Sequence, residues 1–234
     1  SNVPVGTRYE ETDTRKIFRI IDGYNGSNFN EKFPTTGHGW TLNATYASIS
    51  SNTLRMQQSS SDGGSQTARA SKALTTAITI ANSEKMVIDF DLKRNDSANG
   101  AKWNTWSLSS ADDGYANPAS GHRKIAFSMG DNTSIYFQYN TGSGNVESSD
   151  QMGSVQPADN TWRYYRVVVD KSTGGFTYKR FLTNAHRTAG TPVEAECSAT
   201  DINTSWWGGA NLAYWGYSFT SAQTHGAYGF TLDN

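Results

Sequence analysis

The sequence predicts an all-β fold in which two antiparallel β-sheets pack face to face as a sandwich. Short runs of β-branched and aromatic residues recur along the chain, separated by clusters of Gly, Asn, Asp and Ser, as expected for strands and turns. The period of these runs is two, and a helical period of 3.6 hardly extends beyond two turns anywhere. The composition, 35% hydrophobic and 18% charged with abundant Ser, Thr, Asn and Gly, is typical of a turn-rich fold.

The clearest runs predict strands, and about a dozen strands in two sheets would account for the chain length. In chain order these runs are 16–21, 53–57, 85–93, 104–109, 124–129, 134–139, 162–170, 175–182, 213–219 and 227–233. Turn sequences such as Asp22-Gly23, Asn99-Gly100 and Gly174-Gly175 separate them. The segment 183–207 has no clear strand pattern, so it is either a long loop or the place where a short helix packs on a sheet edge.

The run 85–93 shows the alternation most clearly. Its apolar residues Ile88 and Phe90 alternate with Asp89 and Asp91, which predicts one core face and one wet, charged face. In the run 162–170 the pattern is half alternating, and Trp162, like Trp40, leads into an apolar run and is predicted to lie in the core.

Length and charge limit the possible organisation and partners. At 234 residues, the whole chain 1–234 is predicted to form a single sandwich domain. The formal net charge of −1, from 20 basic and 21 acidic residues, lacks the basic excess of nucleic-acid-binding proteins. No apolar run is long enough to span a membrane. The single cysteine, Cys197, excludes an intrachain disulfide and is expected to be a small buried residue.

Aromatic residues provide the main functional signal, because several tryptophans stand in segments rich in Gly, Asn, Ser and Thr. Exposed aromatic rings stack on the apolar faces of sugars, and neighbouring polar side chains bind the hydroxyls. The residues predicted to bind carbohydrate are Trp103, Trp106, Trp206, Trp207, Tyr115, Asn104, Asp112 and Gln138.

Catalytic alternatives have weaker support in the sequence. Asp89 and Asp91 have the spacing of paired glycosidase carboxylates, but a solvated or salt-bridged face explains them better, and Arg94 stands where related glycosidases have a third carboxylate. A polysaccharide lyase would use Tyr136 or Tyr178 to abstract a proton and Arg180 or Gln138 to neutralise a uronate carboxylate. A protein-binding or adhesion domain is a third possibility, which would show a contiguous apolar patch.

The ends of the chain resemble a known family. The segment 28–33 with Gly39-Trp40, the run 160–167 and the closing 229–234 are similar to motifs of concanavalin A-like and laminin-G-like jelly-roll domains in secreted bacterial plant-cell-wall-degrading enzymes. The resemblance implies a two-sheet jelly roll, frequently with a structural Ca²⁺, in a carbohydrate-binding module appended to a larger enzyme. Asp233 matches the terminal Asp that can bind calcium, and Asp22 and Asn25 are further candidates from Asp/Asn-rich turns.

Together these observations predict a non-catalytic module that binds a plant cell-wall polysaccharide: β-glucan, xyloglucan, xylan or pectin. It is expected to be extracellular, bacterial and monomeric, with no nucleic-acid or membrane partner. A cluster of basic residues at Arg163, Arg166, Lys179 and Arg180 would favour an anionic polymer instead.

Overall fold

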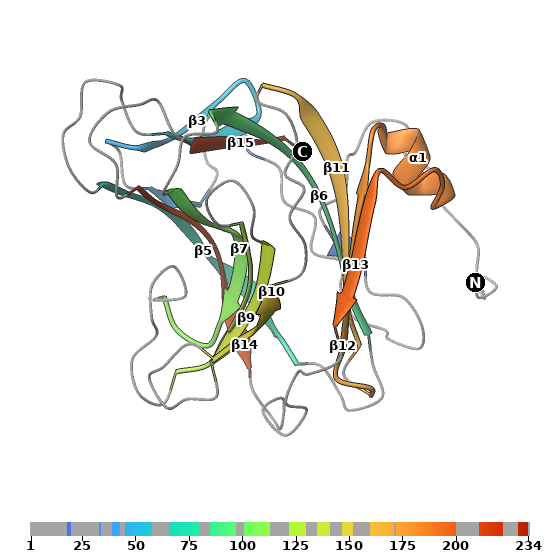
Figure 1. Ribbon diagram of the computed structural model, residues 1–234. Coiled ribbons are helices and arrows are strands. Elements are labelled where there is room, and N and C mark those ends of the chain that lie inside the picture. The colour runs from blue at the N-terminus through green and yellow to red at the C-terminus, as the bar shows by residue number, and fades with distance from the viewer. Residues whose placement is uncertain are drawn as a thin grey trace, which may run out of the picture.

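The computed structural model describes residues 18–19, 33, 39–42, 45–57, 66–79, 85–96, 101–112, 122–129, 135–140, 147–151, 160–170, 172–199, 211–221 and 229–233. Within these residues, two antiparallel sheets pack against each other, as predicted (Figure 1). Sheet A has the strand order β13-β12-β11-β6-β15-β4-β3, with β1 also paired to β6. Sheet B has the order β10-β9-β8-β7-β14-β5-β2.

The strands of sheet A are β1 (Phe18–Arg19), β3 (Ala47–Ser50), β4 (Thr53–Gln57), β6 (Lys85–Asp96), β11 (Trp162–Asp170), β12 (Gly175–Phe181), β13 (Ala195–Ala199) and β15 (Gly229–Asp233). Those of sheet B are β2 (Thr41–Leu42), β5 (Gln66–Ile78), β7 (Ala101–Ser109), β8 (Lys124–Met129), β9 (Ile135–Asn140), β10 (Glu147–Gln151) and β14 (Leu212–Ser221). Strands β4, β8 and β11 have the predicted bounds, whereas β2, β3, β5, β10 and β13 were not predicted.

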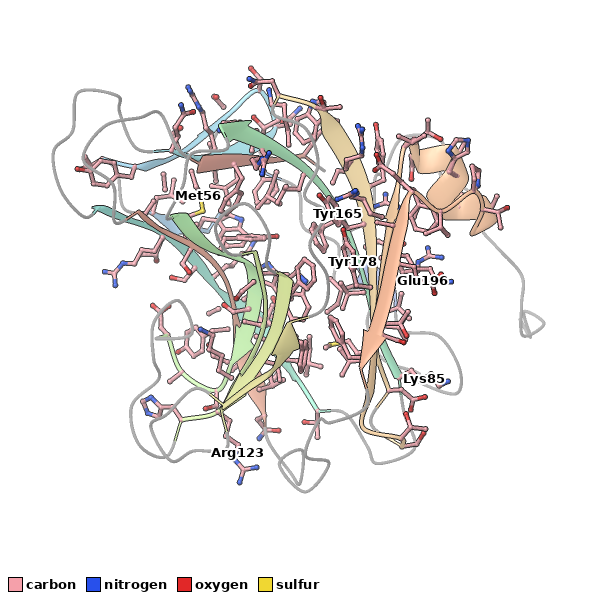
Figure 2. All side chains as sticks on the ribbon, viewed as in Figure 1. Met56, Lys85, Arg123, Tyr165, Tyr178 and Glu196 are labelled. Atoms are coloured by element: carbon pink, nitrogen blue, oxygen red, sulfur yellow. The ribbon has the colours of Figure 1, made fainter. Side chains whose placement is uncertain are left out.

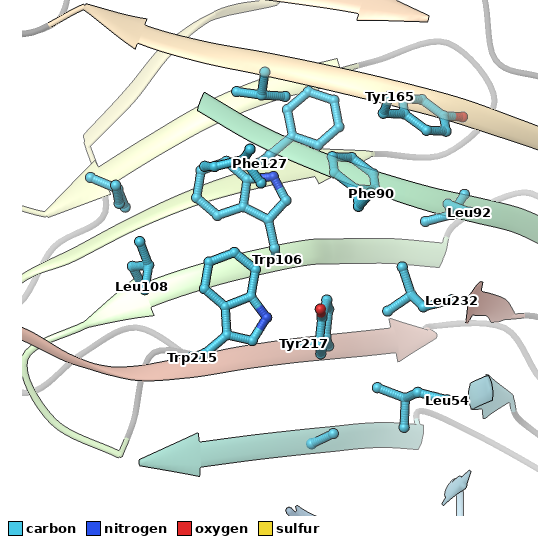
Figure 3. Close-up of a cluster of buried hydrophobic side chains, with 14 of the residues drawn as sticks. Leu54, Phe90, Leu92, Trp106, Leu108, Phe127, Tyr165, Trp215, Tyr217 and Leu232 are labelled. Carbon is cyan, nitrogen blue, oxygen red and sulfur yellow. The ribbon is translucent and has the colours of Figure 1, made fainter. Parts of the chain in front are cut away.

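The core lies between the two sheets and is filled mainly by aromatic rings (Figure 3). Trp106 of β7 stacks on Trp215 of β14 with ring centroids 5.5 Å apart, and Phe90 of β6 stacks on Tyr165 of β11 at 4.8 Å. Trp40 is 6% exposed and packs on Tyr217, which confirms its predicted place in the core. Large rings therefore supply most of the apolar area that this sandwich buries.

Strand β5 was missed because its inward side chains are small. Ala68 and Ala70 are fully buried while Arg69 between them is exposed, so the strand does alternate. Ala70 pairs with Tyr217 of β14, whose large ring fills the space that the alanine leaves. A strand whose apolar face consists of small residues lacks the usual β-branched signal.

The described part of the segment 183–207, residues 183–199, contains one helix and one strand. Helix α1 (Asn184–Ala189) begins after Thr183, whose hydroxyl accepts a hydrogen bond from the His186 amide, and ends at Gly190 with φ of 75°. The helix packs against β11 and β12, and strand β13 then pairs with β12. The predicted alternative of a short helix on the sheet is therefore correct for 184–189.

Candidate ligand-binding face

The structure tests only part of the predicted sugar-binding set. Trp106 is 0% exposed, so its predicted role in stacking on a sugar is wrong: the strand alternation turns its ring into the core. Asp112 is exposed in the turn that follows β7. Trp103 and Asn104 of β7 and Gln138 of β9 have described backbones but not described side chains, and Trp206, Trp207 and Tyr115 lie outside the described residues.

Asp89 and Asp91 of β6 each bind an arginine. Asp89 accepts two hydrogen bonds of 2.7 Å from the Nε and Nη2 atoms of Arg166 on β11. Asp91 forms an ion pair of 2.7 Å with Arg187 of α1, and both side chains are nearly inaccessible. Of the two expected alternatives, the salt-bridged face is thus confirmed and the solvated face is wrong, and the two faces of the strand alternate as predicted. Carboxylates held in this way are poorly suited to glycosidase chemistry.

Two of the residues considered for a lyase site lie on the inner face of sheet A. Tyr178 is 1% exposed and packs against Phe127 in the core, and Arg180 is 2% exposed. Neither can meet a polymer, so their predicted roles are wrong. The side chains of the other candidates, Tyr136 and Gln138, are outside the described residues.

The predicted basic cluster is neutralised by acidic partners. One oxygen of Glu194 accepts hydrogen bonds from the Nε atoms of Arg163 and Arg180, at 2.7 and 2.9 Å. Partial burial opposes ionisation of Glu194, but these hydrogen bonds and the two positive charges outweigh it and hold the pKa of Glu194 below its usual value. Arg166 is paired with Asp89, as above, and Lys179 pairs with Glu196 at 3.0 Å.

The face of sheet B that points away from the core is lined by small residues. Figure 1 shows this sheet bowed toward sheet A, so the outward face is the concave one. Ser71, Gly216, Ser107 and Ala126 align across four neighbouring strands. A Cβ atom added at Gly216 would lie 3.1 Å from Ser107 Oγ, and Ser107 is 1% exposed. These described positions are therefore shielded from solvent.

The outer face of sheet A carries a more accessible set of side chains. One register row crosses five strands from β3 to β11 and consists of Ser48, Arg55, Thr231, Lys93 and Trp162. We call this set the Trp162 row. Ser48 and Arg55 are exposed, Lys93 and Trp162 are partly exposed, and Thr231 is nearly buried at the centre. Trp162 is thus not a core residue, contrary to the sequence-based prediction.

Amide side chains support the row from its edge. Gln57 Oε1 accepts hydrogen bonds from Arg55 Nε at 2.6 Å and from Asn95 Nδ2 at 3.1 Å. Asn95 Oδ1 in turn accepts a 2.9 Å hydrogen bond from the Thr231 hydroxyl. This chain of contacts fixes polar groups of β4, β6 and β15 in one orientation, which reduces the entropy lost when a ligand binds.

At the other end of the row, the Lys93 ammonium lies 5.5 Å from the centroid of the Trp162 ring. Next along β11 on the same face, Tyr164 packs under Arg187 at 5.6 Å. The row thus combines an aromatic ring, two hydroxyls and two cations, side chains that bind sugars but provide no carboxylate base. Residue parity predicts this placement, since the inward Tyr165, Val167 and Val169 require Trp162 to point outward.

Of the three residues predicted to bind calcium, the structure describes Asp233. Asp233 ends β15 opposite Asp91, while Asp22 and Asn25 lie outside the described residues. Within the described part of the chain, no three His, Cys, Asp or Glu side chains are grouped so as to hold a metal ion. Among the same residues, no helix is both long and apolar enough to cross a membrane.

Comparison with known proteins identifies the fold. No protein-family model matches the chain, and no curated protein matches it. Among solved structures, the basic winged bean lectin with Tn-antigen aligns with a TM-score of 0.52 at 12% identity, covering 86% of this chain and 94% of the lectin. The CBM2 module of the evolved Dit of Lactobacillus casei BL23 phage J-1 aligns with a TM-score of 0.50 at 11% identity, covering 87% and 93%. The chain has the concanavalin A-like jelly-roll fold, as its terminal motifs suggested.

Proposed function

We propose that the protein is a non-catalytic carbohydrate-binding module that recognises a plant cell-wall polysaccharide: β-glucan, xyloglucan, xylan or pectin. The observation that carries this proposal is the Trp162 row, a line of accessible aromatic and polar side chains across five strands of sheet A. Neighbouring strands are about 4.8 Å apart, so the row is about 19 Å long. An extended polymer fits such a row better than a compact ligand does.

The chemistry of the row suits a sugar chain. The partly exposed Trp162 ring offers an apolar surface for the C–H face of one sugar, and the Thr231 hydroxyl and the amides of Gln57 and Asn95 offer hydrogen bonds to others. The sheet supplies a rigid backbone beneath them. Sites of this kind bind through a few placed polar groups and one or two rings.

The fold supports the proposal without deciding it. The neighbours above are a lectin solved with Tn-antigen and a CBM2 module, so this scaffold serves proteins described as sugar-binding. We further propose that the module is secreted by a bacterium, acts as a monomer and is appended to a larger enzyme, which it holds near its substrate.

The proposal is tested by affinity gel electrophoresis against a panel of neutral and acidic plant polysaccharides. The wild-type protein is expected to be retarded by at least one polymer. The Trp162→Ala variant is expected to lose most of that retardation or all of it. The matched control is Leu182→Ala, because Leu182 is 47% exposed and lies off the row. Binding that survives Trp162→Ala unchanged would place the site elsewhere, and no retardation by any polymer would refute the function.

The same samples test the lyase alternative. Beta-elimination creates unsaturated uronates, which absorb in the ultraviolet, so incubation with uronate polymers is followed by absorbance. We expect no increase, because the row contains no Tyr or His to abstract the proton, and an increase would show that the protein is an enzyme.

A further inference from the structure

We infer that the polymer bound by the Trp162 row is acidic, with carboxylate groups that contact Arg55 and Lys93. This inference rests on the proposed function and deepens it, because it selects an acidic polymer such as pectate over β-glucan and xyloglucan. It comes from the distribution of charges on the outer face of sheet A.

Most described acidic groups on this face already have a basic partner. Those engaged in ion pairs are Asp89 with Arg166, Asp91 with Arg187, Asp170 with Lys85 and Glu196 with Lys179, at 2.7 to 3.0 Å. Arg55 and Lys93 differ from these basic residues. Within the described part of the chain, Arg55 contacts the Gln57 amide and Lys93 the Trp162 ring, and neither is paired with a carboxylate. The row is therefore the part of this face that retains positive charge.

The two cations are spaced to meet a polymer at two points. Arg55 and Lys93 flank Thr231 on neighbouring strands of the same row, which puts their backbones about 10 Å apart. Trp162 follows one strand beyond Lys93. A chain that lies across the strands can therefore stack one ring near Trp162 and present charged groups to Lys93 and then to Arg55.

Arg55 and Lys93 can each bind an anion without breaking an ion pair with a described carboxylate. Arg55 is exposed and uses Nε to bind Gln57, so the Gln57 contact orients the guanidinium while its Nη groups face a ligand. Guanidinium groups bind carboxylates through two parallel hydrogen bonds. Lys93 would exchange a partly exposed contact with an aromatic ring for a charge-assisted hydrogen bond.

The test compares polygalacturonate with its uncharged methyl ester, which has the same sugar backbone, and with a neutral polymer of different sugars. Binding to polygalacturonate is measured beside fully methyl-esterified polygalacturonate and neutral xyloglucan, at low and high NaCl concentration. The variant Arg55→Gln/Lys93→Gln is compared with Lys85→Gln/Lys179→Gln, which removes the same charge from paired lysines on the same face. Circular dichroism and the unfolding midpoint confirm that both variants fold.

We expect polygalacturonate to bind most tightly and binding to weaken as salt screens the charges. Two partly exposed charge contacts are worth about 0.2–1 kcal/mol each, so the row variant should lose about twofold to thirtyfold in affinity, and the control less than about twofold. Equal binding of the esterified and free polymers, or equal losses in the two variants, overturns the inference.

The outcomes separate this inference from the proposed function. Binding only to xyloglucan or β-glucan, abolished by Trp162→Ala, keeps the carbohydrate-binding function and refutes the acidic ligand. Failure to bind any polysaccharide in the panel refutes both.

Discussion

Arg187 of helix α1 places its Nη1 atom 2.7 Å from Asp91 Oδ1 on strand β6, and the two side chains are 4% and 3% exposed. The same Nη1 donates hydrogen bonds to the backbone carbonyls of Phe90 and Tyr165, at 3.1 and 3.3 Å. One side chain thus attaches the helix to two neighbouring strands of sheet A. Figure 2 shows α1 with its side chains beside β11 and β13.

Arg187→Ala is expected to lower the free energy of unfolding by about 3–5 kcal/mol, because it removes one partner of a buried ion pair and leaves the Asp91 carboxylate without the Arg187 charge. Urea denaturation at neutral pH measures the change. The control is Lys179→Ala, whose ion pair with Glu196 is 35% and 47% exposed and should contribute less than about 1 kcal/mol. Equal effects of the two substitutions would contradict a structural role for the buried pair.

Tyr165→Phe is expected to leave stability unchanged or to raise it by about 1 kcal/mol. The hydroxyl is buried and has no hydrogen-bond partner among the described residues, so its loss of hydration on folding is not compensated. Removing the hydroxyl removes this unfavourable contribution to the free energy of folding. Burial also raises the pKa of Tyr165 far above its usual value, so this tyrosine should not ionise in an alkaline titration of the folded protein. A loss of stability above about 1 kcal/mol would indicate a hydrogen bond from another part of the chain.

Glu194 should make the protein less stable in acid. Its pKa in the folded state is below its usual value, so the stabilisation is present above the pKa of the unfolded chain and is lost as pH falls through the folded-state pKa. Glu194→Gln should therefore be less stable than wild type at pH 7, and the difference should shrink in strong acid. Unfolding curves at pH 7, 4 and 2.5 measure it. A difference that does not change with pH would rule out a charge effect.

Two tryptophans should respond to truncation in opposite ways. Trp106→Ala removes a fully buried ring from the aromatic stack and should cost about 3–5 kcal/mol in the free energy of unfolding. Trp162→Ala, on the outer face, should cost about 1 kcal/mol or less and should abolish polysaccharide binding. Thermal unfolding and affinity electrophoresis of the same samples compare the two effects. A large stability loss for Trp162→Ala would mean that the ring serves packing.

Calcium is proposed to bind at a site that includes Asp233. Added Ca²⁺ should raise the unfolding temperature, and EDTA should reverse the effect, because a ligand that binds only the folded state stabilises it. Asp233→Asn should weaken the response, with Asp170→Asn as a control at the distant end of the same sheet. An unchanged unfolding temperature across the Ca²⁺ titration would refute a structural calcium site.

Local alternation predicts most of the framework but not the pairing of charges. The parity of Ile88 and Phe90 in β6, and the limits of β4, β8 and β11, follow from side-chain period and turn residues alone. The Asp89–Arg166 pair joins positions 77 residues apart, and it forms because the register places Arg166 opposite Asp89. Sequence spacing carries no information on such a register, so the sequence alone does not tell whether these aspartates are solvated or salt-bridged, or name their partners.

The candidate site shows the same limit. Trp162 stands before an apolar run, which favours a core residue, and only its odd separation from the inward Tyr165 and Val167 turns it outward. Its row partners Thr231 and Arg55 lie in distant segments that β15 and β4 bring together. A row that crosses five strands is a property of strand order, which the sequence does not reveal.

The position of β15 also has a consequence for folding. This strand lies between β4 and β6, so it joins the two parts of sheet A, although it comes last among the described strands. During synthesis, the facing edges of β4 and β6 have no partner there until residues 229–233 leave the ribosome. Exposed strand edges recruit other chains, so the newly made protein is most prone to aggregate in this interval. A chaperone that shields these edges during this interval should therefore improve the yield of folded protein.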